Sequence, residues 1–299
     1  MKIGVLTMPK FSQNFFLLLC LITPAVVFVL GMCIFPAIWS VFLSLCRYDF
    51  RRGLPVFIGL GNYLKILKSP TFPKSLFVTL NYAVFTTLLS SLIGLGLALL
   101  FNQQFRGRSL IRGLLVIPWA VPWVVSAFLW ASIFSSDFGI LNAILYKLGI
   151  INDYVVFLSK DFAIYAVAIA TSWNLSSLTA ILCLAALQSI PESLYEAAAI
   201  DGATTLEIFK NITFPWVRPI WSLTIILNAF TAVTMFDMIY LMTAGGPGEA
   251  TLTLPIYSFR TFFLEMRIGE GAAIANIASL LGLIVALIYF RIFYRRIEI

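Results

Sequence analysis

The stretch SIPESLYEAAAIDGATTLEIFKNITFPWVRP, residues 189–219, is the longest interruption with polar residues between the hydrophobic runs of the C-terminal half. It contains two patterns typical of helix starts: Ser189 stands three residues before Glu192, and Thr204 stands three residues before Glu207. In such a capping box the hydroxyl accepts a hydrogen bond from a free backbone N–H while the carboxylate reaches back. The stretch therefore predicts two short helices inside one loop.

The first helix is expected over residues 190–200, with Pro191 in its first turn, where a missing N–H has little consequence. It should stop at Gly202, because glycine best tolerates a left-handed C-terminal cap. The second helix is expected to end before Pro215.

The first helix carries a surface that is unusual for an isolated helix. Four apolar residues share one face by their spacing: Ile190, Leu194, Ala197 and Ala198. Glu192 and Glu196 lie one turn apart and repel each other, and Asp201 lies at the negative end of the helix dipole. The residues alone leave two interpretations, a helix that docks into another protein and a helix that lies on the membrane surface.

Six positions of the stretch resemble, at every spacing, the EAA loop of the membrane subunits of binding-protein-dependent ABC importers: Glu196, Ala197, Ala198, Gly202, Ile212 and Pro215. The chain departs from the family pattern at Phe214, where leucine is usual, but an apolar residue is kept. The resemblance implies a cytoplasmic helix-turn-helix seated in a cleft of a separate ATP-hydrolysing subunit. It implies a coupling role for nine residues: Glu192, Leu194, Glu196, Ala197, Ala198, Asp201, Gly202, Ile212 and Pro215.

Composition places the chain in a lipid bilayer. Of its 299 residues, 61% are hydrophobic and 11% are charged, which is outside the range of a soluble globular domain. The net charge of +7 comes from basic residues that cluster at the ends of apolar runs, where they meet lipid headgroups. A nucleic-acid partner is therefore not expected.

The sequence lacks the residues that usually perform catalysis or bind metals. It has no histidine, its four cysteines show no C-x-x-C spacing, and no G-x-x-x-x-G-K-[ST] phosphate loop occurs. The glycine-rich run at residues 245–248 lacks the lysine of such a loop and is interpreted as a turn. We expect no catalytic residue, metal or cofactor, and ATP hydrolysis must take place on other subunits.

Hydrophobic runs predict an all-α integral membrane fold, a bundle of six transmembrane helices that forms one domain over residues 1–299 and includes the loop 189–219. The spans are expected near residues 11–46, 76–101, 113–136, 162–188, 220–243 and 272–293. The first run is much longer than a signal-peptide core and is expected to be retained. In the third run, Pro118 and Pro122 free backbone carbonyls that lipid cannot satisfy.

Orientation does not follow from charge alone. An even number of spans places both termini on one side of the membrane. Three arginines in the loop 102–112 favour the cytoplasm for that loop, whereas the basic loop after the first span argues for the opposite orientation. The resemblance decides between them, because an EAA loop must face the ATPase. We therefore expect a multi-pass protein of the cell membrane with both termini in the cytoplasm.

Two further segments resemble carbohydrate importers. Residues 57–63, FIGLGNY, are similar to the F-x-G-L-x-N-Y element that follows the first span in the maltose-type first permease. The setting of Asp237, FDMIY followed by LMT and a Gly-Gly-Pro turn, resembles the corresponding region of sugar permeases. Together with the EAA loop, these segments imply a permease for a sugar.

An ionisable residue inside a span usually marks a pathway or a buried pair, and Asp237 in the fifth span is the one candidate. Sugars are recognised by aromatic faces together with amides and hydroxyls. Five further residues are therefore candidates for the substrate pathway: Trp173, Asn174, Asn228, Tyr240 and Asn276. The alternative for Asp237 is a structural pairing with a partner subunit.

The expected function is that of a permease subunit of an ABC importer that couples sugar passage to ATP hydrolysis elsewhere. By resemblance, its partners are a second homologous permease, two ATP-hydrolysing cassette subunits and an extracytoplasmic solute-binding protein. A polyol or a sugar phosphate is the alternative solute. An ion-coupled secondary transporter would need ion ligands at mid-membrane and internal repeats, and the sequence offers Asp237 alone and no clear repeat.

Overall fold

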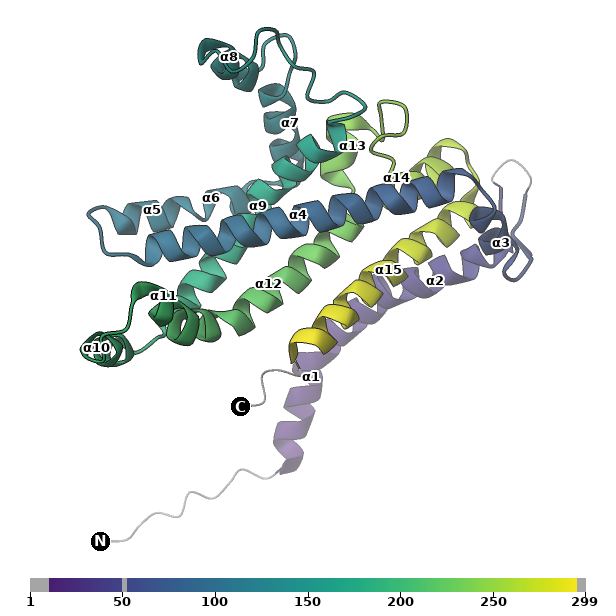
Figure 1. Cartoon of the computed structure of the whole chain (residues 1–299). Coiled ribbons are helices and arrows are strands. Elements are labelled where there is room, and N and C mark those ends of the chain that lie inside the picture. Colours follow the sequence, from purple (N-terminus) through teal and green to yellow (C-terminus); the bar gives the residue numbers. More distant parts are fainter. Residues whose placement is uncertain (1–10, 50–52, 295–299) are drawn as a thin grey trace.

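The computed structural model describes residues 11–49 and 53–294, and most of them lie in helices (Figure 1). In chain order the α-helices are α1 (Phe11–Val29), α2 (Phe35–Ser44), α3 (Gly61–Leu67), α4 (Thr71–Asn102), α5 (Arg108–Leu114), α6 (Ile117–Ala120), α7 (Trp123–Ile133), α8 (Ile140–Lys147), α9 (Ala163–Gln188), α10 (Glu192–Ile200), α11 (Thr205–Ile208), α12 (Phe214–Thr234), α13 (Asp237–Thr243), α14 (Leu254–Phe259) and α15 (Ile268–Tyr294). The π-helices are η1 (Leu30–Ile34), η2 (Phe209–Thr213) and η3 (Arg260–Leu264). Strand β1 (Cys46–Arg47) pairs antiparallel with β2 (Val56–Phe57).

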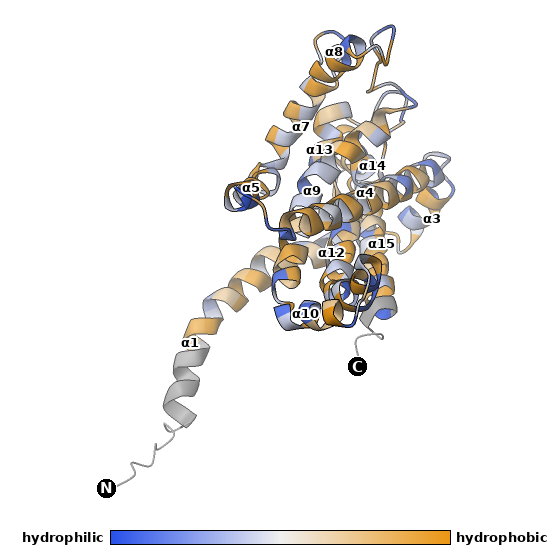
Figure 2. Ribbon diagram, turned by 60° about the vertical axis from the view of Figure 1, so that its left-hand side comes forward, coloured by the Kyte–Doolittle hydropathy of each residue, from blue (hydrophilic) through white to orange (hydrophobic). Residues whose placement is uncertain are grey.

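Five helices of the described residues are long and apolar enough to cross a membrane: Cys20–Ser44, Thr71–Asn102, Ala163–Gln188, Thr205–Thr234 and Ile268–Arg291. A sixth crossing requires that Arg108–Ala120 and Trp123–Ile133, bent by 98° at a break, count as one span. Apolar residues colour the long helices orange in Figure 2, and blue residues gather at loops and helix ends. The predicted helical membrane architecture is confirmed, whereas six straight spans are not found among these residues.

The bend in the predicted third span lies at Val121 and Pro122. A proline disfavours the helical conformation of the residue before it, and Val121 is extended with ψ 126°. Pro122 is also extended, with ψ 143°, and forms the N-terminal cap of α7. The two consecutive extended residues turn the chain sharply, so α7 leaves the direction of α5 and α6 (Figure 1).

Two other prolines lie in continuous helices, each just after a π-helix. η1 precedes Pro36 in α2, and η2 precedes Pro215 in α12. A proline ring clashes with the carbonyl four residues earlier and cannot donate to it, and the wider π turn relieves that contact. The second helix of the loop 189–219 therefore continues through Pro215 into α12, and the predicted stop before Pro215 is wrong.

Helix α9 lies at the centre of the bundle and packs against α4 and α12. Small residues let α4 and α9 approach closely. Ala98 is fully buried, and a Cβ added to Gly94 would lie 2.5 Å from the Cβ of Thr179 and 2.8 Å from the carbonyl oxygen of Ser176. The α4–α9 interface therefore has no room for a larger side chain at Gly94.

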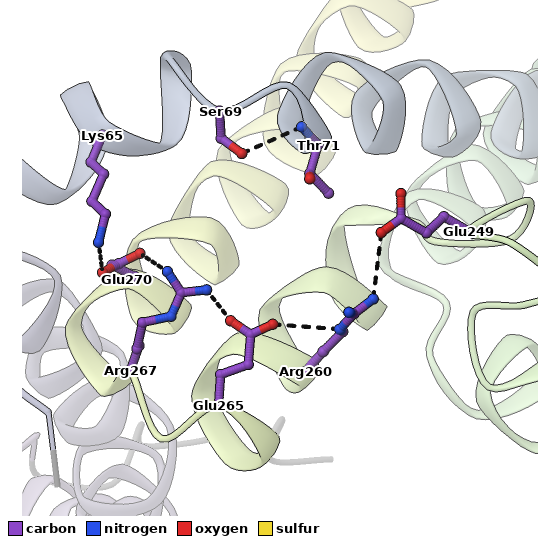
Figure 3. A network of polar contacts seen from close by, with 8 residues as sticks. All are labelled: Lys65, Ser69, Thr71, Glu249, Arg260, Glu265, Arg267 and Glu270. Atoms are coloured by element: carbon purple, nitrogen blue, oxygen red, sulfur yellow. Dashed lines mark hydrogen bonds and ion pairs between the residues drawn. The ribbon is translucent and has the colours of Figure 1, made fainter. Parts of the chain in front are cut away.

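At the end of the bundle opposite α10, ion pairs fasten α3 and the segment around η3 to the start of α15 (Figures 1 and 3). The chain of alternating charges is Lys65, Glu270, Arg267, Glu265, Arg260 and Glu249. Lys65 Nζ lies 2.5 Å from Glu270 Oε1, and Arg267 Nη1 lies 2.7 Å from Glu270 Oε2. Partial burial lowers the pKa of Arg267, but the carboxylates beside it outweigh this and raise it above its usual value. Arg267 therefore stays charged and bridges two acids.

Candidate functional site

Helix α10 begins differently from the predicted capping box. Its N-terminal cap is Pro191, and no side chain caps it. The Ser189 hydroxyl donates to the carbonyl oxygen of Ala186 at 2.7 Å and accepts from the indole N–H of Trp216 at 3.0 Å. The predicted box of Ser189 and Glu192 is therefore wrong, because α9 runs on until Ser189 caps its C-terminus.

The second capping box and the left-handed end of α10 are both present. The backbone N–H of Thr204 donates to Glu207 Oε2 at 2.7 Å, and the N–H of Glu207 donates to Thr204 Oγ1 at 3.4 Å. Gly202 has φ +73°, and the N–H of Ala203 donates across it to the Ala198 carbonyl at 2.9 Å. These bonds define the turn of the helix-turn-helix and confirm the predicted cap at Gly202.

No side chain of α10 is buried. Leu194 is 39% exposed, and Ile200 and Leu206, which flank the turn, are 86% and 67% exposed. Ile190 lies before α10 and is buried in the bundle, so the predicted apolar face loses this residue. Ile200 and Leu206 were not among the predicted coupling residues, although apolar residues beside a glycine turn in a polar loop were a visible signal.

Two contacts hold the helix-turn-helix on the bundle. The Tyr195 and Thr213 hydroxyls lie 3.2 Å apart and share a hydrogen bond, and Ile212 packs partly buried against the core cluster that includes Leu187. Pro215 lies exposed in the first turn of α12. The acids of the segment are exposed: Glu192, Glu196 and Asp201. All nine predicted coupling residues therefore lie on one continuous segment attached at one end of α9.

The amides predicted for the substrate pathway bond to neighbouring helices instead of pointing into an open cavity. Asn228 is 1% exposed, and its Nδ2 donates to Ser90 Oγ and to Thr179 Oγ1, each at 3.0 Å. Ser40 of α2 donates to Asn276 Oδ1 of α15 at 3.2 Å. These two amides join helices in the described state, and a role in solute passage stays a prediction.

Asn174 joins the two halves of the bent span. Its Nδ2 donates to the carbonyl oxygen of Pro118 at 2.7 Å and to Ser126 Oγ at 3.0 Å. Pro118 belongs to α6 and Ser126 to α7, so one amide bonds to both sides of the break. Asn174 is 2% exposed, and its partners are again those of a packing residue.

The aromatic candidates lie in two groups. Tyr240 stacks on Phe236 with ring centroids 5.1 Å apart, and Phe259 of α14 lies 5.0 Å from each ring. Trp173 of α9 stands edge-on to Trp130 of α7, with ring centroids 6.0 Å apart. Helix α7 also packs against α13, so both groups border the α7–α13 contact.

Asp237 does not lie in the middle of a span. Helix α12 ends at Thr234, Met235 is extended with ψ 123°, and α13 begins at Asp237. The exposed carboxylate therefore occupies the first turn of α13, where the helix dipole favours a negative charge. The predicted fifth span over residues 220–243 is corrected to two helices, and Asp237 stands at the break between them.

The described residues contain no group of three or more His, Cys, Asp or Glu side chains that could hold a metal ion. Their cysteines are unpaired, with Cys46 and Cys183 buried and Cys20 and Cys33 exposed.

Comparison with known proteins gives this arrangement a family. A family model described as "Binding-protein-dependent transport system inner membrane component" matches residues 90–299. The trehalose/maltose transport system permease protein MalF of Thermococcus litoralis is 36% identical over 91% of this chain and 92% of its own length. Two permease proteins of Agrobacterium fabrum are also similar. The permease of the sulfoquinovosyl glycerol transport system is 34% identical over 91% of this chain and 88% of its own length. The permease of the sn-glycerol-3-phosphate transport system is 30% identical over 93% of this chain and 94% of its own length.

A solved structure shares the fold. A chain of a bacterial ABC transporter involved in the import of the acidic polysaccharide alginate aligns with a TM-score of 0.82 at 21% identity, over 96% of this chain and 98% of that chain. The family model covers more than half of the sequence, and the relatives cover nearly all of it. The chain therefore belongs to the family of binding-protein-dependent transport system inner membrane components, the non-catalytic permease subunits of ABC importers.

Proposed function

We propose that this chain forms one half of the translocation pathway for a sugar and that residues 189–219 couple it to ATP hydrolysis on separate cassette subunits. Helix α10 carries the proposal. All of its side chains remain accessible, although its C-terminus is held by the Gly202 turn and the adjoining capping box. A helix with a defined end and no fully buried residue is suited to a surface on another subunit.

The exposed residues of this segment describe the surface that would receive it. Leu194 and Ile200 are apolar, and acids surround them at Glu192, Glu196 and Asp201. The complementary cleft has an apolar floor and a basic rim, so that burial of the apolar side chains supplies affinity and the charges set the orientation.

The aromatic groups support a polyhydroxylated solute. The similar permeases are named for trehalose and maltose, for sulfoquinovosyl glycerol and for sn-glycerol-3-phosphate. Tyr240 and Trp173 offer aromatic faces to sugar C–H groups, and the exposed carboxylate of Asp237 offers an acceptor for hydroxyls. In this proposal Asn174, Asn228 and Asn276 hold helices together, because their amides are engaged with neighbouring helices.

A phosphorylated polyol is the second candidate solute, since one relative is named for sn-glycerol-3-phosphate. Repulsion between Asp237 and a phosphate favours the neutral sugar. In importers reconstituted with their ATPase and binding protein, Asp237→Asn should lower the transport of a neutral sugar such as maltose. An Asp237→Asn variant that left maltose transport unchanged and gained uptake of glycerol phosphate would favour the second candidate.

The complete importer in this proposal contains a second homologous permease, two ATP-hydrolysing subunits and an extracytoplasmic solute-binding protein. The solved alginate transporter, in complex with its periplasmic protein, supports the last of these partners. Because α10 must meet the ATPase, both termini face the cytoplasm, and the ion-pair end with α3 faces outward. The chain then crosses the membrane six times, with α5 to α7 forming one bent crossing.

Site-directed crosslinking tests coupling and orientation together. In a chain whose four cysteines are replaced by alanine, Leu194→Cys should crosslink to the ATPase within the assembled importer. Leu187→Cys is the matched control, because Leu187 lies near the end of α9 and is 2% exposed. If Lys68→Cys at the opposite end reached the ATPase and Leu194→Cys did not, both the orientation and the coupling role of α10 would be lost.

A further inference from the structure

The break between α6 and α7 leaves the carbonyl of Pro118 without its helical partner. In a regular α-helix the Pro118 carbonyl would accept from the N–H of residue 122, which is a proline and has none. Pro118 is half-buried, and the Asn174 side chain that faces its carbonyl is 2% exposed. An unpaired backbone carbonyl at such a place would destabilise the bend.

Two side chains of α9, one turn apart, donate hydrogen bonds to the residues around this break. Asn174 Nδ2 donates to the Pro118 carbonyl at 2.7 Å and, on the other side of the break, to Ser126 Oγ at 3.0 Å. One turn further along α9, the hydroxyl of Ser177 donates to the carbonyl of Leu115, which lies between α5 and α6. The bend of 98° is thus tied to α9 before the break and after it.

This contact lies between the two functional regions of the chain. From Asn174, α9 runs 14 residues to Gln188, a distance of about 21 Å at the usual helical rise, and α10 follows after residues 189–191. On the other side, α7 packs against α13, which carries Tyr240. A movement of α10 that displaced α9 along its axis would therefore act on α7 through Asn174.

We propose that Asn174, supported by Ser177, is the positioning residue that sets the direction of α7 and passes the displacement of α10 to the α7–α13 contact. The inference rests on the proposed coupling role of α10. Asn174 Oδ1 is buried and accepts from no residue that the structure describes. Because an amide oxygen can accept hydrogen bonds, this atom can take a different donor when α7 changes direction.

The test compares Asn174→Ala, the double variant Asn174→Ala/Pro122→Ala and the control Ser172→Ala in the importer reconstituted with its partners. Ser172 is buried on α9, and its hydroxyl lies 2.7 Å from the Ala168 carbonyl of its own helix and 3.2 Å from the Thr86 carbonyl of α4, away from the break. Two quantities are measured, the melting temperature of the assembled importer and the number of solute molecules transported per ATP hydrolysed. Pro122→Ala returns an N–H that can bond to Pro118, so it restores hydrogen bonding without restoring the bend.

Asn174→Ala should lower the melting temperature and reduce transport per ATP about fivefold or more, the usual size of a coupling effect. The double variant should regain the melting temperature while transport per ATP stays low, and Ser172→Ala should keep the wild-type ratio. A wild-type ratio in Asn174→Ala, or recovery of the ratio together with stability in the double variant, would reduce Asn174 to a packing residue. If Asn174→Ala does not assemble, the transport ratio of the double variant still distinguishes a positioning role of Asn174 from a packing role.

A failure of the proposed function is separate from a failure of this inference. Wild-type chain that binds no ATPase overturns the coupling role of α10, and with it the route from α10 to Asn174. Wild-type chain that transports with ATP, beside an Asn174→Ala chain with an unchanged ratio, overturns the positioning role alone.

Discussion

Helices α9 and α10 follow each other in the chain and have opposite surroundings. In the apolar window of α9, 72% of the residues are buried, whereas no residue of α10 is. Both helices are rich in alanine, but α9 carries no charged residue and α10 has Glu192 and Glu196 one turn apart. Alanine permits close approach in either helix. The uncharged α9 makes that approach within its own bundle, whereas the charged α10 stays exposed and is free for the partner subunit that we propose.

The largest expected effect comes from enlarging a residue at the buried interface of α9. A Cβ at Gly94 would lie 2.5 Å from the Cβ of Thr179 and 2.8 Å from a backbone oxygen that cannot move away independently. Gly94→Val should therefore destabilise the bundle by about 3 kcal/mol, as overpacking does. Thermal unfolding of the purified protein in detergent measures the loss.

Gly96→Val is the matched control on the same helix. An added Cβ there meets nothing within 4 Å, and Gly96 is exposed on α4. Its melting temperature should stay close to that of the wild type. Equal destabilisation by the two valines would mean that α4 and α9 do not approach closely at Gly94. The description of α9 as a tightly packed, buried helix would then be wrong.

A smaller effect on stability, with a full effect on function, is expected at the exposed end of α10. Gly202 has φ +73°, and a Cβ there meets nothing within 4 Å, so Gly202→Val adds backbone strain of about 1 kcal/mol and no clash. The turn would relax and present Leu194 and Ile200 at a different angle. We expect normal membrane insertion, loss of ATPase on co-purification and loss of transport.

Gly107→Val is the matched control for Gly202→Val, because it adds the same kind of backbone strain at a glycine outside the helix-turn-helix. Gly107 has φ +85° and equally open surroundings, but it lies before α5 and outside the helix-turn-helix. This variant should keep its ATPase. Retention of ATPase and wild-type transport in Gly202→Val would show that α10 is not the coupling element, whatever its exposure.

Much of the loop 189–219 was predictable from sequence, because its signals are local. The cap at Gly202 and the box of Thr204 depend on residues within a few positions of each other, and both are present. The box at Ser189 failed for a non-local reason: the buried face of α9 extends helix formation to Gln188, and Ser189 then bonds to Ala186 and Trp216.

The breaks in the spans also differ in whether a local sequence signal predicts them. The third span was expected to be interrupted because Pro118 and Pro122 are visible in the sequence. The break at Met235 has no proline or glycine beside it, and the exposed Asp237 that follows was interpreted as a residue within a span.

The role of the asparagines predicted for the substrate pathway could not be decided from the sequence. A polar residue in an apolar run looks the same whether it meets a solute or a neighbouring helix. The partners of Asn174 include Pro118, 56 residues earlier, and those of Asn228 include Ser90, 138 residues earlier. Contacts over such separations follow from the packing of the bundle and from no local pattern.

The smallest expected effect separates the two predicted capping boxes. Thr204→Ala removes an acceptor that the Glu207 N–H uses in the structure, so the amides of α11 should exchange with solvent about fivefold faster, the usual consequence of a lost cap. Ser189→Ala should leave exchange in α10 unchanged, because Ser189 does not cap that helix. Hydrogen exchange read by mass spectrometry over residues 189–213 measures both. Faster exchange of α10 in Ser189→Ala would mean that its hydroxyl does cap α10 in solution, and the boundary between the buried helix and the exposed one would then lie one turn earlier than the structure places it.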